Sequence, residues 1–125
     1  YSAGSKEKPE GSMFDAFRKY DVGMIGIKPF ASGTVFQSRG VPDSPTKQED
    51  DDRARLVLRY VLCCDALTCA IPGLITVDQV RNAASAVKER RQLDLAETRR
   101  LEEITGQMWA NLPQGYCWLR EWEWV

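Results

Sequence analysis

The chain has 125 residues, a length typical of one domain, and its 43% hydrophobic and 28% charged residues are the composition of a soluble globular protein. A formal net charge of −1 gives no electrostatic reason to expect binding to nucleic acid or to an anionic membrane. No apolar run approaches the roughly 20 residues that span a bilayer.

The first eleven residues, YSAGSKEKPEG, are polar and rich in Gly and Ser, and we expect them to form a loop. The chain starts at Tyr1 rather than Met, so any original targeting segment is not visible in this sequence. The composition is compatible with a cytoplasmic protein but does not specify the compartment. Residues 12–20 predict a short helix that is N-capped by Ser12 and buries Phe14 and Phe17.

The segment GMIGIKP, residues 23–29, predicts a strand. Its nearly continuous apolar residues indicate burial on both faces, as in a parallel sheet, and Gly26 indicates a close approach to its backbone. Lys28 stands at the C-terminal end of this strand. It either extends its stem along the surface or presents a cation to a ligand at the mouth of the sheet.

Residues 31–47 contain two glycines and two prolines and predict a long irregular loop, of a kind that is usually functional or mobile. The acidic run 48–52, QEDDD, is typical of the first turn of a helix, where carboxylates interact well with the helix dipole; a metal site is the alternative. Residues 53–65 continue this helix. From Leu56 onward nearly every residue except Arg59 is apolar, which predicts a helix buried between a sheet and its neighbours.

The stretch from Leu67 to Val87 predicts a strand, a turn and an amphipathic helix in succession. Residues 67–71 are apolar and short enough for a strand, and Pro72-Gly73 ends it, with Gly73 free to adopt a positive φ. Thr76 and Gln79 form a T-x-x-Q capping box. The apolar face of the helix is expected to consist of Val80, Ala83, Ala84 and Val87.

The C-terminal third predicts a solvated segment, a helix and a tail. Residues 88–92 are charged or polar, and Asp94 with Glu97 forms a second capping box that opens a helix over 93–108. We expect Gly106 to mark the end of that helix. The helix should bury Leu101, Ile104 and Met108 and expose Arg99, Arg100, Glu102 and Glu103. Residues 109–125 form an aromatic tail, with Tyr116, Trp118, Trp122 and Trp124, that we expect to lie over apolar surface.

Cysteine spacing and the lack of histidine exclude several chemistries. The cysteines Cys63, Cys64, Cys69 and Cys117 form no C-x-x-C pair, and the chain has no histidine. Zinc and iron–sulfur sites of the usual spacing, and Ser-His-Asp or Cys-His catalysis, are therefore not expected. We predict no metal ligands and no catalytic residue. The first three cysteines are expected to be small buried side chains; a thiol oxidoreductase built on Cys63-Cys64 is the minor alternative.

Two strands separated by a helix predict a right-handed βαβ unit with parallel strands. Two parallel strands do not make a complete sheet, so we expect the chain to be part of a larger fold whose other strands precede Tyr1. In isolation, such a piece should self-associate or lay its aromatic tail across the gap.

The segments GMIGIKPFASG (23–33), RLVLRYVL (55–62) and AIPGLITVDQVRNA (70–83), in this order and spacing, resemble the last quarter of an aldo/keto reductase. The resemblance covers residues 12–105. It implies an α/β fold that is a partial (β/α)8 TIM-barrel fragment, with strands seven and eight and their helices.

The resemblance also implies a cofactor site for NADP or NAD. By position, Lys28, Pro29, Phe30, Ser32 and Gly33 would line the pyrophosphate side of the cofactor. The adenosine end would be met by Gly73, Leu74, Ile75, Gln79 and Asn82. Where some members of the family carry Lys-Ser for a 2′-phosphate, this chain has Gly73-Leu74, so the choice between NAD and NADP stays open.

The function implied is the cofactor-phosphate-binding portion of an NAD(P)H-dependent carbonyl oxidoreductase. The catalytic tetrad of the family belongs to the first half of the barrel, so the chain as given is not catalytically complete. Its expected partners are the missing N-terminal barrel half or a second copy of itself. The alternative is a non-catalytic module, derived from the barrel, that binds a nucleotide or a protein.

Overall fold

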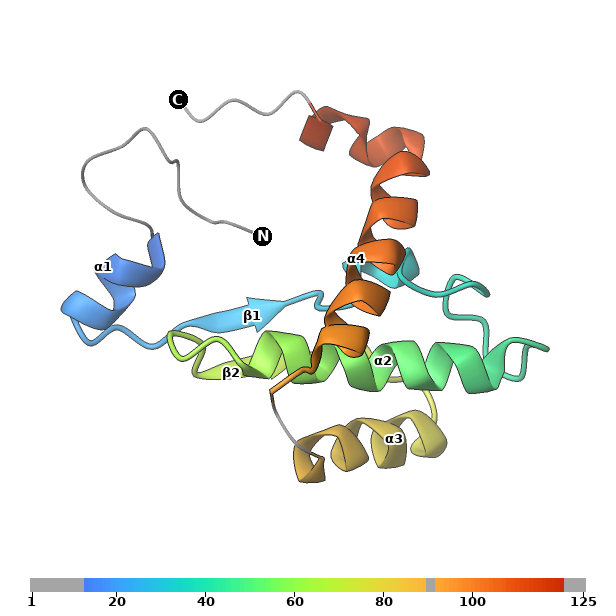
Figure 1. Ribbon diagram of the computed structural model, residues 1–125, viewed down its shortest axis with the longest axis horizontal. Coiled ribbons are helices and arrows are strands. Elements are labelled where there is room, and N and C mark those ends of the chain that lie inside the picture. Colours follow the sequence, from blue (N-terminus) through green and yellow to red (C-terminus); the bar gives the residue numbers. More distant parts are fainter. Residues whose placement is uncertain (1–12, 90–91, 121–125) are drawn as a thin grey trace.

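The computed structural model of the protein describes residues 13–89 and 92–120, which form a mixed α/β fold rich in helix (Figure 1). A two-stranded sheet lies beside a central helix, and two further helices pack around that helix. In chain order the elements are α1 (Met13–Lys19), β1 (Ile25–Ile27), the 3-10 helix η1 (Ala31–Gly33), α2 (Lys47–Leu62), β2 (Cys69–Ile71), α3 (Val77–Lys88), α4 (Leu95–Ala110) and the 3-10 helix η2 (Gln114–Arg120).

The two strands pair in parallel, as predicted, with Ile25 opposite Cys69 and Ile27 opposite Ile71. Both are three residues long, shorter than expected. Ahead of them the pairing becomes irregular, because the Thr68 hydroxyl accepts a hydrogen bond from the Met24 N–H at 3.0 Å. The close approach predicted at Gly26 is confirmed: a Cβ there would lie 2.9 Å from the Leu67 side chain.

One face of the sheet is bare within the described part of the chain. Ile25, Ile27 and Ile71 alternate with Gly26 and Ala70, so they share a face with Cys69. Their exposed fractions are 60%, 69% and 54%. The prediction that β1 is buried on both faces is therefore wrong, because α2 lies against the sheet and no described element covers the other face.

Helix α2 is the centre of the fold and contacts α3, β2 and α4 (Figure 1). Its first turn carries Glu49 and Asp50, as the dipole argument predicts. Arg59, the polar exception on its apolar half, is only 7% exposed because its guanidinium binds the Glu97 carboxylate at 2.7 and 3.0 Å. The core around this helix consists of Phe30, Val35, Leu56, Val57, Leu58, Ala86, Leu101 and Ile104.

Both predicted capping boxes are present, Thr76 with Gln79 at the start of α3 and Asp94 with Glu97 at the start of α4. The face predicted for α3 is wrong in part. Ala83 and Ala86 pack against the core, whereas Val80 and Val87 are more than half exposed and Ala84 is exposed as well. The small alanines face α2 because they allow the two helices to approach closely, and the valines point away from it.

Helix α4 buries Leu101 and Ile104 and exposes its charged residues, as predicted. Gly106 does not end it, and the helix continues to Ala110. A glycine inside a helix costs only about 1 kcal/mol relative to alanine. The end is instead marked by Asn111, whose N–H donates to the Gln107 carbonyl at 3.1 Å.

The cysteines contradict the prediction of burial: Cys63 and Cys69 are exposed, and Cys64 and Cys117 are partly buried. Cys63 and Cys64 follow the end of α2, and Cys69 lies on the bare sheet face, so none of these three enters the core. In the tail, Tyr116 is partly buried and its hydroxyl donates to the Ser32 hydroxyl at 3.0 Å. Predictions for residues 1–12, 90–91 and 121–125, Ser12, Trp122 and Trp124 among them, lie outside the described residues.

Candidate functional site

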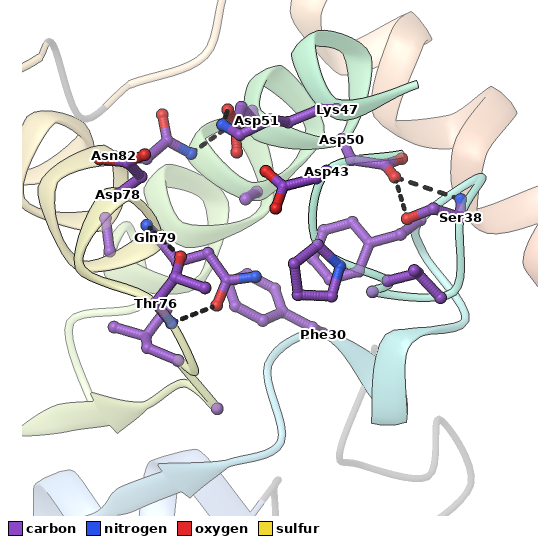
Figure 2. Close-up of a pocket in the computed structure, with 18 residues that line it drawn as sticks. Phe30, Ser38, Asp43, Lys47, Asp50, Asp51, Thr76, Asp78, Gln79 and Asn82 are labelled. Carbon is purple, nitrogen blue, oxygen red and sulfur yellow. Dashed lines mark hydrogen bonds and ion pairs between the residues drawn. The ribbon is translucent and has the colours of Figure 1, made fainter. Parts of the chain in front are cut away.

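A cavity of about 260 Å³ opens beside the carboxyl ends of the two strands, between α2, the start of α3 and the loop that precedes α2 (Figure 2). Parallel pairing places Lys28 and Pro72, the residues that follow β1 and β2, at the same edge of the sheet. The cavity is lined by Phe30, Phe36, Ser38, Gly40, Val41, Pro42, Asp43, Lys47, Asp50, Asp51, Ala54, Gly73, Leu74, Thr76, Asp78, Gln79, Asn82 and Ala83.

Half of the residues predicted for a cofactor site line this cavity. They are Phe30, Gly73, Leu74, Gln79 and Asn82. The structure does not place Lys28, Pro29, Ser32, Gly33 and Ile75 in its wall. Lys28 and Pro29 belong to the turn between β1 and the 3-10 helix η1, Ser32 and Gly33 lie within η1, and Lys28 is exposed.

The turn after β1 has an unusual backbone. Lys28, Ala31 and Ser32 have φ values of 53°, 46° and 56°, in the left-handed region that side chains other than glycine rarely adopt. Gly33 has a φ of 85°, and a Cβ on it would lie 2.8 Å from the Arg39 carbonyl oxygen, so glycine is required here. These residues fold the chain back so that Phe30 is buried against Phe36, with ring centroids 5.1 Å apart.

At the start of α3, the side chain of Gln79 holds the backbone that leads into the helix. Its Oε1 accepts from the Ile75 N–H at 2.7 Å. It also accepts from the Thr76 N–H at 3.2 Å, as Figure 2 shows. Gly73 does not adopt the positive φ that is open to a glycine, and a Cβ there would meet nothing within 4 Å. Glycine at this position leaves open space above the turn.

Asn82 is engaged in the fold at both ends of its amide. Its Nδ2 donates to the Asp51 carbonyl at 2.8 Å, and its Oδ1 accepts from Arg55 at 2.6 Å. These bonds tie α3 to α2. Asn82 therefore has a role in fixing the cavity wall, in addition to the contact to adenosine that the resemblance predicts.

Asp50 is a residue of the cavity that was predicted as a dipole partner or, in the alternative, as part of a metal site. Its carboxylate accepts from the N–H groups of Gln37 at 2.7 Å and Ser38 at 3.1 Å, from the Thr46 hydroxyl at 3.3 Å, and from the Ser38 hydroxyl. It is buried and holds the loop 37–46 onto α2. Its neighbours in the acidic run are also engaged: Glu49 pairs with Arg53, and Asp52 with Arg55.

The cavity wall is acidic. Four aspartates, Asp43, Asp50, Asp51 and Asp78, line it against a single lysine, Lys47. The Lys47 ammonium lies 2.6 Å from Asp51, and this hydrogen bond raises the pKa of Lys47, with smaller contributions from the charges of Asp51, Asp78 and Asp43. The positive charge of Lys47 is thus already paired with the carboxylate of Asp51. The remaining wall combines aromatic and aliphatic side chains, which suits an uncharged ring that carries polar groups.

Comparison of the chain with protein-family models, with curated proteins and with solved structures finds no match. Among residues 13–89 and 92–120, no helix is both long enough and apolar enough to cross a bilayer. The strand ends and the cavity beside them are therefore the features of the molecule that bear on its function.

Proposed function

We propose that the chain is the C-terminal, cofactor-phosphate-binding portion of an aldo/keto reductase-like, NAD(P)H-dependent carbonyl oxidoreductase. In this proposal β1 and β2 are the seventh and eighth strands of a (β/α)8 barrel. The chain binds and orients the cofactor, and the residues that transfer the proton belong to the rest of the barrel.

The observation that carries the proposal is the two-sided character of the sheet. In a (β/α)8 barrel each strand faces its helices on one side and the packed barrel interior on the other. Here α2 lies against the sheet, and the opposite face presents Ile25, Ile27 and Ile71. Exposed isoleucines in register on two parallel strands are what a sector of a barrel would present to the missing interior, because branched aliphatic residues fill that interior.

The strand ends support a cofactor site. In barrels of this kind the phosphate site is commonly formed after strands seven and eight, with the N-terminus of a helix. The structure has Lys28 at the end of β1, a glycine with open space after β2, and the capped start of α3 beside them. A pyrophosphate at this edge could approach the Gly73 backbone closely and meet the Lys28 ammonium.

Lys28 provides the test. The natural gene product that contains these residues should bind NADH or NADPH, measured by quenching of its tryptophan fluorescence. Lys28→Met keeps the aliphatic stem and removes the charge, and it should weaken binding about tenfold, the value of one charge-assisted contact of about 1.4 kcal/mol. Lys88→Met, at the exposed C-terminal end of α3, is the matched control and should leave binding unchanged.

Gly73→Leu is the second variant. It should not destabilise the fold, because Gly73 does not have a positive φ and a Cβ there would meet nothing within 4 Å. The leucine should block the approach of a pyrophosphate and reduce binding. Failure of the wild-type protein to bind either nucleotide would overturn the proposal, as would equal binding by wild type, Lys28→Met and Gly73→Leu.

A further inference from the structure

We infer that the cavity selects NADH over NADPH, because its wall takes the free hydroxyls of the adenosine ribose and rejects a phosphate there. The inference rests on the proposed function and deepens it, since the sequence left the choice between the two cofactors open. It follows from which polar groups of the cavity are already used by the fold and which remain for a ligand.

The fold uses most of the polar groups in the wall. Asp50 is satisfied by the loop before α2, Asn82 ties α3 to α2, and Lys47 is paired with Asp51. The carboxylates of Asp43 and Asp78 remain exposed to solvent at the cavity. Figure 2 shows Asp43 in the middle of the cavity, between α2 and Phe30.

Within the described part of the chain, Asp78 forms an ion pair with Arg81 at 3.2 Å. Arg81 lies three residues further along α3, and its side chain is 75% exposed. It does not belong to the cavity wall. Among the described residues, the wall has one cation, Lys47, and it is already paired with Asp51, so a ligand meets carboxylates there. Asp43 and Asp78 both lie near enough to the Lys47 ammonium to raise its pKa, so their charges act on the same small volume.

The chemistry of the two cofactors differs at one group. The ribose of NADH carries a 2′-hydroxyl, which can donate a hydrogen bond to a carboxylate, whereas NADPH carries a phosphate with a charge of about −1.5 to −2. A phosphate beside two carboxylates is repelled, and a cationic side chain is the usual partner that accommodates it. The apolar part of the wall, with Phe30, Phe36 and Leu74, suits the flat adenine ring.

Isothermal titration of the natural gene product with NADH and with NADPH tests the inference. Wild type should bind NADH at least about tenfold more tightly than NADPH. In Asp43→Asn/Asp78→Asn this ratio should fall to about threefold or less, mainly through tighter binding of NADPH. Asparagine tolerates the left-handed φ of 58° at position 43, so the loop should keep its conformation.

The control is Glu102→Gln/Glu103→Gln, which removes the same charge from the exposed face of α4. It should leave the NADH-to-NADPH ratio at its wild-type value. Binding of NADPH as tight as NADH by wild type would overturn the inference and leave the proposed function standing, and so would a ratio that is the same in Asp43→Asn/Asp78→Asn and in wild type. Binding of neither nucleotide would overturn the proposed function itself.

Discussion

Asp50 supports the loop before α2, and its replacement by asparagine should be strongly destabilising. Its two oxygens accept from the N–H groups of Gln37 and Ser38 and from two hydroxyls. Asparagine keeps one accepting oxygen, but its amide group would face the other N–H donor. Hydrogen bonds to a charged acceptor contribute about 1.5–3 kcal/mol each, so Asp50→Asn should cost about 2–4 kcal/mol.

The neighbouring residue provides the control for this substitution. Asp51 forms an i,i+4 ion pair with the partly exposed Lys47, and such pairs contribute at most about 1 kcal/mol, so Asp51→Asn should be nearly neutral. Urea unfolding followed by circular dichroism gives both free energies, and the melting temperature of Asp50→Asn should be lower by about 10 °C. A difference of less than about 0.5 kcal/mol between the two variants would refute the role given to Asp50.

Two further predictions follow from the ion pairs and from the sheet. A hydrogen bond from Arg53, with the charge of Arg100, holds the pKa of Glu49 below its usual value. The stability that this pair contributes should be complete above the ordinary glutamate pKa of about 4.3 and should be lost as the pH falls through the lowered value. Because Glu49 is a third exposed, the loss of unfolding free energy should be under about 1 kcal/mol. Urea unfolding between about pH 5 and 3 should show this loss in the wild type and not in Glu49→Gln. Parallel pH profiles of the two proteins would contradict this prediction. The bare sheet face should make the 125-residue chain self-associate in light scattering, and Ile25→Thr/Ile27→Thr should reduce this while leaving the melting temperature within about 3 °C. A wild-type chain that stays monomeric at high concentration would contradict this expectation.

The local structure could be predicted well from the sequence where the signal is itself local. Both capping boxes and the buried face of α4 follow from residues a few positions apart, and the parallel strand pair follows from the order strand, helix, strand. The errors arose where burial depends on a distant partner. Val80 and Val87 have the spacing of a buried face, but α2 packs against the alanines of α3 instead. The isoleucines of β1 form a strand, and no periodicity could show that one side of it would be left bare.

The candidate site was predictable only in outline. The meeting of the two strand ends followed from parallel pairing, and five of the ten expected residues line the cavity. The roles of Asn82 and Asp50 were missed because each is defined by hydrogen bonds to backbone groups more than ten residues away. The acidic wall was missed for a similar reason: Asp43 and Asp78 are 35 positions apart in the sequence.

The double hydrogen bond of Asn82 has a consequence for how a molecule reaches the cavity. Asn82 binds α3 to α2, and Asp50 binds the loop 37–46 to the same helix. The positions of α3 and of the loop, the two other walls of the cavity, are therefore both fixed relative to α2. A ligand therefore binds to a preformed cavity. The conformational entropy of ordering the cavity walls is lost when the chain folds and not when the ligand binds. Association should then be governed by diffusion and charge and should proceed without a slow rearrangement step.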